Sequence, residues 1–241
     1  SILWADEIIV ADSFSTDGTT EIAEELGAKV IHIPFNGYGD LRNKAISYCN
    51  GDWIFSLDSD ERCTIEVKNE ILSTIDNPNF DIYKLPRKNF FMGKWIKHSG
   101  WYPNFRQPQL FRNGKMSYSL DEVHEGFISH SSKEIGVLKN YIWQFPFKNT
   151  EEIIYKANRY STLGVKKLQD KGVTGGVFKA FIHGSWSFIK HYIFKLGFLD
   201  GGAGFVIAFG NFEGTFYRYI KLAEADSNWT TPKTKSPPKD L

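Results

Sequence analysis

The residues best suited to chemistry are two aspartates one residue apart, Asp58 and Asp60, which follow an apolar run over residues 53–57. An apolar run of this length is typical of a buried strand. In an extended segment both carboxylates project to the same side, and their hard oxygen atoms favour Mg²⁺ or Mn²⁺. The pair can therefore hold a divalent cation against a diphosphate, which indicates an enzyme that uses a nucleotide-activated substrate. The alternative is a solvated acidic turn at the end of a strand.

A third aspartate, Asp12, ends another predicted strand, over residues 7–12. If this strand and the one before Asp58 share a parallel sheet, their carboxyl ends lie at one edge, where such sheets bind ligands. Asp12 would then accept a hydrogen bond from a base or a ribose. The alternative is that Asp12 caps a turn with Ser15 and Thr16.

The elements that must position these aspartates alternate in period along the amino-terminal part of the chain. The pattern predicts further strands over 29–33 and 53–58 and helices over 17–26 and 39–48. Ser15 or Thr16 is the expected N-cap of the first helix, and Gly27 its left-handed stop. Strands separated by a helix or a loop imply right-handed crossovers and a parallel sheet.

Beyond these elements the sequence predicts a closing region and then helices. A helix is expected over 64–75, and a long helix begins at Thr150 and reaches about residue 171, with Glu151 and Glu152 in its first turn. Between them lie aromatic-rich segments that we expect to be short strands, closing the sheet and building the acceptor side: 80–85, 89–91, 101–102, 109–112 and 135–145.

The segment from Lys171 to Leu199 contains no acidic residue. A basic amphipathic helix with a Trp- and Phe-rich apolar face suits the plane of an anionic bilayer surface, whereas the alternative is an ordinary helix packed on the core. Residues 201–222 add more apolar surface than a small domain easily hides, which favours peripheral membrane attachment. The polar side of the helix carries these residues: Lys179, His183, Ser187, Lys190, His191 and Lys195.

Composition limits the remaining possibilities. The 241 residues are 41% hydrophobic and 24% charged, enough for one good core and an appendage, and a net charge of +1 does not indicate a nucleic-acid partner. Two cysteines exclude a disulfide framework and favour a reducing compartment. No apolar run reaches the roughly 20 residues of a membrane span, and the first residues lack the features of a signal peptide. We therefore expect a cytoplasmic protein.

Two segments, 8–19 and 51–61, resemble the nucleotide-binding half of family 2 glycosyltransferases, which are inverting enzymes with the GT-A fold. Segments 95–102, 123–125, 158–162 and 197–201 resemble, more weakly, the bacterial lipopolysaccharide-core beta-1,4-glucosyltransferase-like branch. The resemblance implies a Rossmann-like α/β fold, with a mixed, largely parallel sheet flanked by helices and an amphipathic helical appendage at the carboxyl end. We expect three regions: a catalytic domain over 1–148, a membrane-associated helical region over 149–225 and a disordered tail over 226–241.

The resemblance also implies roles for single residues. Asp12 would contact the uracil or ribose of a UDP-sugar, and Ser15 belongs to the same nucleotide-binding motif. Asp58 would bind the ribose and the metal, and Asp60 the metal that bridges the two phosphates. Arg42 matches a basic position near the diphosphate.

The family places its catalytic base after the later strands of the sheet. The candidates here are Asp121, Glu122 and Glu125, of which we favour Glu125, and the alternative is a solvated acidic loop. An inverting transfer needs one such carboxylate to deprotonate the acceptor hydroxyl. Trp101 and Tyr102 could stack on acceptor sugar rings or belong only to the core.

Two departures from the family pattern stand out. Phe14 occupies the place of the usual glycine, so the loop must keep a negative φ or carry strain. The family also begins with a strand and helix that this chain is expected to lack.

The function expected is an inverting, metal-dependent transfer of a hexose from a UDP-sugar to a lipopolysaccharide-core or other lipid-linked glycan at the cytoplasmic membrane surface. The alternatives are a truncated, non-catalytic membrane-associated glycan-binding protein and a sugar nucleotidyltransferase.

Overall fold

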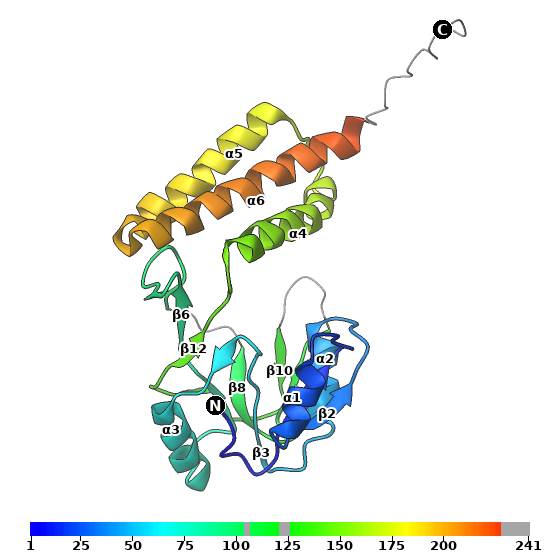
Figure 1. Ribbon diagram of the computed structural model, residues 1–241, viewed down its shortest axis with the longest axis vertical. Helices are drawn as coiled ribbons and strands as arrows, with labels where there is room; N and C mark the ends of the chain where they lie inside the picture. Colours follow the sequence, from blue (N-terminus) through cyan, green and yellow to red (C-terminus); the bar gives the residue numbers. More distant parts are fainter. Residues whose placement is uncertain (104–106, 121–125, 228–241) are drawn as a thin grey trace, which may run out of the picture. The chain divides into compact units, whose positions relative to one another are not determined.

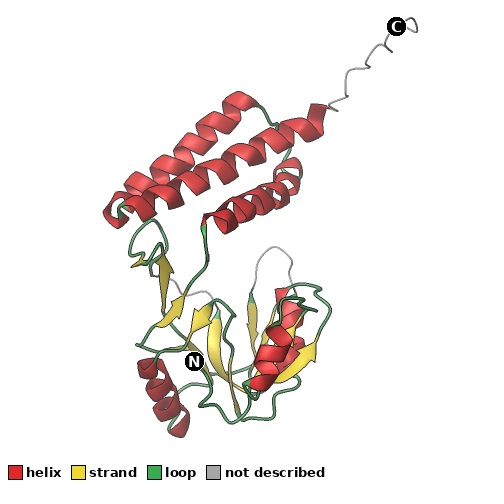
Figure 2. Ribbon diagram, viewed as in Figure 1, coloured by secondary structure: helices red, strands yellow, loops and turns green. Residues whose placement is uncertain are grey.

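The computed structural model describes residues 1–103, 107–120 and 126–227, which form two compact units. Unit 1 comprises Ser1–Phe90 and Tyr102–Pro146, and unit 2 comprises Phe91–Trp101 and the chain from Phe147 onward. Unit 1 contains most of the strands, and unit 2 consists mainly of helices (Figures 1 and 2). The expected mixed α/β architecture with helices flanking sheets is confirmed.

The described residues of unit 1 form short strands and three helices. The helices are α1 (Thr19–Glu25), α2 (Tyr38–Ile46) and α3 (Ile65–Asp76). The strands are β1 (Ile9–Asp12), β2 (Lys29–His32), β3 (Trp53–Phe55), β4 (Glu61–Arg62), β5 (Ile82–Lys84), β6 (Arg87–Phe91), β8 (Pro108–Arg112), β9 (Met116–Tyr118), β10 (Phe127–Ser129), β11 (Gly136–Val137) and β12 (Ile142–Gln144).

The central sheet has the strand order β11-β5-β8-β3 and buries both of its faces. Adjacent residues of β5 alternate between the faces, as the pleat requires. Tyr83 packs in a cluster with Val67 and Ile71 of α3, and Ile82 packs in a second cluster with Ile54 and residues of β9. The sheet is therefore the middle layer of unit 1.

One sequence expectation about this sheet is wrong. β1 pairs in parallel with β2 in a separate two-stranded sheet, whereas β3 pairs antiparallel with β8. The spacing of the strands allowed a crossover but did not specify which strand is the neighbour. Pairing with β8 places Ile54 opposite Phe111, and both are buried in one cluster. Burial of these side chains accounts for the choice of neighbour.

The helix ends follow local chemistry, with one correction. Thr64 caps α3, because its hydroxyl accepts from the Val67 amide at 3.3 Å. The N-cap of α1 is Gly18 rather than Ser15 or Thr16, and Asp17 accepts from the Thr19 amide and hydroxyl instead. The expected left-handed stop at Gly27 is confirmed, with φ of 84°.

Unit 2 contains α4 (Thr150–Gln169), α5 (Val177–Ile189) and α6 (Gly202–Ser227), with α5 continuing into a π-helical turn over Lys190–Phe194. A 3-10 turn over Gly197–Asp200 leads into α6, and the short strand β7 (Lys94–Trp95) comes from the earlier part of the chain. The hydrophobic core of unit 2 contains Phe91 and Ile96 together with residues of α4 and α6. None of the described helices is long and apolar enough to span a bilayer.

A buried aspartate fastens the two sequence segments of unit 2 together. The Asp200 carboxylate accepts hydrogen bonds from the amides of Lys97 and His98, at 3.1 Å each, and from the Ser99 hydroxyl at 2.8 Å. This explains why residues 91–101, which the sequence placed with the catalytic domain, belong to the helical unit. The expected tail from residue 226 begins with the last two residues of α6, and its remainder lies outside the described residues.

Candidate active site

The acidic segment after β3 forms a tight turn. The Glu61 amide donates to the Asp58 carbonyl at 2.9 Å, and the Asp58 amide donates back to the Glu61 carboxylate at 3.0 Å. The expectation that Asp58 and Asp60 lie in an extended segment is therefore wrong, because β3 ends at Phe55 and this reciprocal pairing closes the chain into a turn.

Glu61 anchors the turn from the buried side. The residue is 2% exposed, and its carboxylate lies 2.6 Å from Arg87 Nε and accepts from Gln109 Nε2 at 2.8 Å. Burial raises the pKa of Glu61 to about 7, although the nearby Arg87 opposes this shift. Sequence analysis assigned no role to Glu61, because the sequence does not show that β6 and β8 surround it.

The two aspartates of the turn have different partners. Asp58 Oδ1 lies 2.9 Å from the Arg42 guanidinium, and Gln144 donates to Asp60 Oδ2 at 3.2 Å. The Asp58 side chain is 41% exposed, so its carboxylate remains accessible to a ligand. The structure thus places Arg42, for which the sequence predicts a position near the diphosphate, beside Asp58.

Helix α2 delivers Arg42 between two tyrosine rings. The guanidinium carbon lies 5.7 Å from the Tyr38 ring centre and 5.2 Å from that of Tyr118. The neighbouring Asn43 side chain pairs with the backbone of Tyr118 through two 2.8 Å hydrogen bonds. These contacts fix α2 to β9 and hold Arg42 in a defined position.

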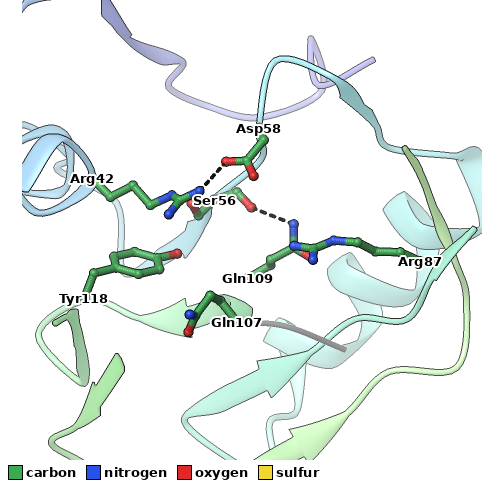
Figure 3. A pocket seen from close by; sticks show the side chains of 7 residues that line it. All are labelled: Arg42, Ser56, Asp58, Arg87, Gln107, Gln109 and Tyr118. Atoms are coloured by element: carbon green, nitrogen blue, oxygen red, sulfur yellow. Dashed lines mark hydrogen bonds and ion pairs between the residues drawn. The ribbon is translucent and has the colours of Figure 1, made fainter. Parts of the chain in front are cut away.

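A pocket opens beside the Asp58 carboxylate (Figure 3). Gln109 Oε1 is buried there without a hydrogen-bond partner among the described residues, which leaves an acceptor for a ligand donor. The pocket thus combines cationic, anionic and neutral polar groups, a set suited to a charged polyhydroxylated molecule. Its lining residues are Arg42, Ser56, Asp58, Arg87, Gln107, Gln109 and Tyr118.

Sequence analysis did not identify Arg87, Gln109 or Tyr118. These residues come from β6, β8 and β9, and none belongs to a motif with a chemical meaning. The one available signal was a glutamine inside the otherwise apolar segment 108–111, since a polar side chain in a buried strand needs a specific partner.

Asp12 caps a turn at the end of β1. It is 3% exposed, accepts from the Ser15 amide at 2.9 Å and lies 3.3 Å from His32 Nδ1. Hydrogen bonding from Ser15 holds the pKa of Asp12 below its ordinary value. Because β1 and β3 belong to different sheets, the expected common edge of Asp12 and Asp58 is wrong.

Phe14, next to this turn, has a φ of 63°. Of the two expected outcomes, a negative φ or a strained loop, the structure shows the second. A left-handed conformation at a residue other than glycine costs about 1–2 kcal/mol. The exposed Phe14 ring stacks on His32, with ring centres 5.6 Å apart and planes 14° from parallel. This contact offsets part of the strain.

The remaining predicted site residues divide into two groups. Asp121, Glu122 and Glu125 lie outside the described residues. Trp101 and Tyr102 are described but do not form the expected strand, because the Trp101 amide donates to the His98 carbonyl in a turn. Trp101 packs in the aromatic cluster of unit 2, and the Tyr102 hydroxyl lies 3.1 Å from that of Tyr141 in unit 1.

The acidic turn fits a divalent cation that a substrate helps to bind. Among the described residues no three His, Cys, Asp or Glu side chains form a metal cluster. Mg²⁺ is commonly held by one or two carboxylates together with substrate phosphates, so Asp58 and Asp60 suffice for the protein's share. The exposed Asp58 carboxylate is available for this role.

Comparison with known proteins identifies the family. The sequence profile described as Glycosyl transferase family 2 matches residues 4–129. An uncharacterized glycosyltransferase of Rickettsia felis is 30% identical over 237 residues, which cover 91% of this chain and 81% of the relative. The chain belongs to glycosyltransferase family 2. This glycosyltransferase is also 26% identical to the lipopolysaccharide core biosynthesis glycosyltransferase LpsC of Rhizobium meliloti, over 90% of its own length and 82% of LpsC.

Solved structures also resemble this glycosyltransferase. Residues 1–349 of S. aureus TarS match with a TM-score of 0.44 and 21% identity, over 64% of this chain and 56% of the TarS chain. The TarS region in complex with UDP-GlcNAc matches with the same TM-score and 18% identity. The glycosyltransferase spans just over half of the TarS chain.

Proposed function

We propose that this family 2 glycosyltransferase is an inverting, metal-dependent hexosyltransferase that uses a UDP-hexose as donor. The observation that carries the proposal is the acidic turn, in which the buried Glu61 fixes the Asp58 backbone and leaves the Asp58 carboxylate accessible beside Arg42. Carboxylates and a guanidinium in one pocket suit a diphosphate held together with a divalent cation.

The nucleoside half of the donor is assigned to the turn after β1. The Asp12 carboxylate accepts a hydrogen bond from the uracil or the ribose, and Ser15 lies beside it. The lowered pKa of Asp12 keeps it ionised, so it remains an acceptor across the physiological range. Arg42 contacts the diphosphate through its planar guanidinium, which matches phosphate oxygens in a bidentate manner.

Asp58 and Asp60 would hold Mg²⁺ or Mn²⁺. A cation held by these two carboxylates would supply positive charge to offset that of the departing diphosphate. Asp58 is paired with Arg42, and donor binding would exchange this ion pair for separate contacts of each residue. The buried Glu61 keeps the turn closed during this exchange, because its hydrogen bond is to the Asp58 backbone rather than the side chain.

In the transfer step the acceptor hydroxyl oxygen forms a bond to the anomeric carbon on the face opposite UDP. The bond from this carbon to the phosphate oxygen breaks, and the electron pair leaves with UDP. A carboxylate takes the hydroxyl proton, with Glu125 favoured over Asp121 and Glu122. Single displacement on the opposite face inverts the anomeric centre.

The proposed acceptor is a lipopolysaccharide-core or other lipid-linked glycan, with Trp101 and Tyr102 as candidate contacts for its sugar rings. The similarity to LpsC supports this class of acceptor. Exposed aromatic side chains of unit 2, among them Phe178 and Trp186, support a peripheral position on the inner face of the cytoplasmic membrane.

The test is UDP release by the full chain from a panel of UDP-hexoses, with Mg²⁺, Mn²⁺ or a chelator and a lipid-linked acceptor. We expect turnover that requires the metal and falls by about 100-fold or more in Asp60→Ala, because the cation loses one of its two protein ligands. The matched control is Asp76→Ala, which removes an exposed carboxylate at the end of α3 and should leave turnover unchanged.

Two outcomes would contradict the proposal. Turnover that persists in Asp60→Ala, or in the presence of a chelator, would show that the transfer does not require a metal. Binding of glycan without turnover of any donor would instead select the non-catalytic, glycan-binding alternative.

A further inference from the structure

Helix α5 exposes a continuous apolar stripe. Five large side chains three or four residues apart lie on one face of the helix and its π-helical extension, and each is between 41% and 77% exposed. Such a run on one face is much larger than the scattered apolar residues of an ordinary surface. The apolar stripe consists of Phe178, Ile182, Trp186, Ile189 and Ile193.

The packing of α5 against the protein is the reverse of that of an ordinary amphipathic helix. Its buried positions are the small residues Ala180 and Gly184. A Cβ atom at Gly184 would lie 3.0 Å from the Phe212 ring of α6, so any larger residue there would require the ring to shift. Figure 1 shows α5 and α6 running side by side. The large side chains of the apolar stripe are instead exposed, as in helices whose outer face contacts lipid.

Positive charge borders the apolar stripe. Lys179 and Lys190 are exposed and follow the helical positions next to the stripe, and Lys195 lies just beyond the π-helical turn. The sequence from Lys171 to Leu199 contains no acidic residue to neutralise them. Lysine side chains on the border of an apolar face can extend to phosphate headgroups while their stems remain among apolar groups.

We infer that α5 lies in the plane of an anionic phospholipid bilayer surface, with the apolar stripe inserted between the acyl chains and Lys179 and Lys190 at the headgroups. The inference rests on the proposed function in so far as a lipid-linked acceptor requires the enzyme at a membrane. Charge complementarity selects the occupant, because a basic border fits anionic lipid and repels a second copy of the same surface. The absence of a described membrane-spanning helix agrees with a position along the surface.

The first test is flotation of the full chain with phosphatidylcholine vesicles that contain or lack phosphatidylglycerol. We expect binding to the anionic vesicles, weakened by salt, and a loss of roughly tenfold or more in affinity for Phe178→Ser with Trp186→Ser. The matched control is Ile65→Ser with Leu72→Ser, because both side chains are exposed on a helix of unit 1. Equal loss in the two double variants would overturn the inference.

Charge and self-association provide the second test. Lys179→Glu with Lys190→Glu should remove the preference for anionic vesicles, and an unchanged preference would overturn the role of the basic border. Sedimentation velocity tests whether a second copy of the chain covers the apolar stripe instead. If Phe178→Ser with Trp186→Ser converts a dimer to a monomer, the stripe is an interface between copies and the inference is overturned.

UDP release in the absence of vesicles separates this inference from the proposed function. The stripe variants should retain full hydrolysis of the donor, and Asp60→Ala should lose hydrolysis while still binding vesicles. Failure of vesicle binding with normal turnover would therefore refute the docking surface alone.

Discussion

Three acidic side chains within four residues have different environments. Asp58 is accessible and paired with Arg42, Asp60 accepts from Gln144, and Glu61 is buried against Arg87. The buried Glu61 carboxylate accepts hydrogen bonds from Gln109 and the Asp58 amide and lies beside Arg87, so it is not available to a ligand in the open pocket. Glu61 is thus a positioning residue, which acts through the Asp58 backbone.

Substitution of Glu61 should change the pH dependence of stability. Its pKa rises from the ordinary 4.5 to about 7 on folding, so the folded state binds more protons between these values and stability falls as pH rises through this window. Because glutamine does not titrate, we expect Glu61→Gln to gain about 1–3 kcal/mol relative to the parent between about pH 5 and about pH 8.

Urea unfolding of both proteins across this range measures the effect. A relative loss of stability by Glu61→Gln on going to high pH would show that the ion pair with Arg87 outweighs burial.

The residues of the site were only partly predictable. Asp12, Asp58 and Asp60 follow recognisable apolar strands, so local patterns were enough to select them, whereas Arg42 was selected only through the resemblance to the family. The residues that surround Glu61 come from strands distant in sequence, and no local pattern encodes which strand lies beside another. The partners of Asp58 and Asp60 could not be predicted either, because Arg42 and Gln144 belong to elements distant in sequence.

At the scale of elements, the position of α2 depends on a close contact with Ser119, the residue that follows β9. A Cβ atom at Gly39 would lie 2.0 Å from the Ser119 carbonyl oxygen, which is backbone and cannot move away easily. We expect Gly39→Ala to destabilise the protein by about 1–3 kcal/mol and to weaken donor binding, because α2 carries Arg42. Urea unfolding and the KM for the donor measure the two effects.

Gly202→Ala is the control for this substitution. No atom lies within 4 Å of a Cβ at Gly202, at the start of α6, so alanine there should be neutral or stabilising by up to about 1 kcal/mol. Equal stability of the two variants would mean that the contact of α2 with Ser119 relaxes without cost.

Most helices and several strands could be predicted from periodicity and caps. Thr64 before α3 and Asn149 before α4 bond to amides of the first turn, which is a local interaction that the sequence displays. The neighbour of β3 depended instead on the burial of Ile54 against a strand more than fifty residues later. The break in α5 at the π-helical turn likewise has no sequence signal that we identify.

At the scale of the whole molecule, each unit has a core of its own and should unfold in a transition of its own. We expect Asp200→Asn to lower the stability of unit 2 by about 2 kcal/mol, because the amides of Lys97 and His98 lose a charged acceptor. Calorimetry should show one of two transitions shifted, and hydrogen exchange should accelerate at these two amides.

Asp170→Asn is the matched control, since Asp170 is an exposed aspartate at the end of α4. Equal shifts of both transitions in Asp200→Asn would show that the two units unfold as one.

The contacts of Asp200 also decide how the gene can be divided. A fragment that starts at Phe147 contains all the long helices of unit 2 but lacks Phe91, Ile96 and the amides that bind Asp200. Such a fragment would expose apolar surface and leave a buried carboxylate without donors. Transfer of the helical unit to another protein therefore requires residues 91–101 to be transferred as well. They could be connected to the helices by a linker or co-expressed as a separate peptide.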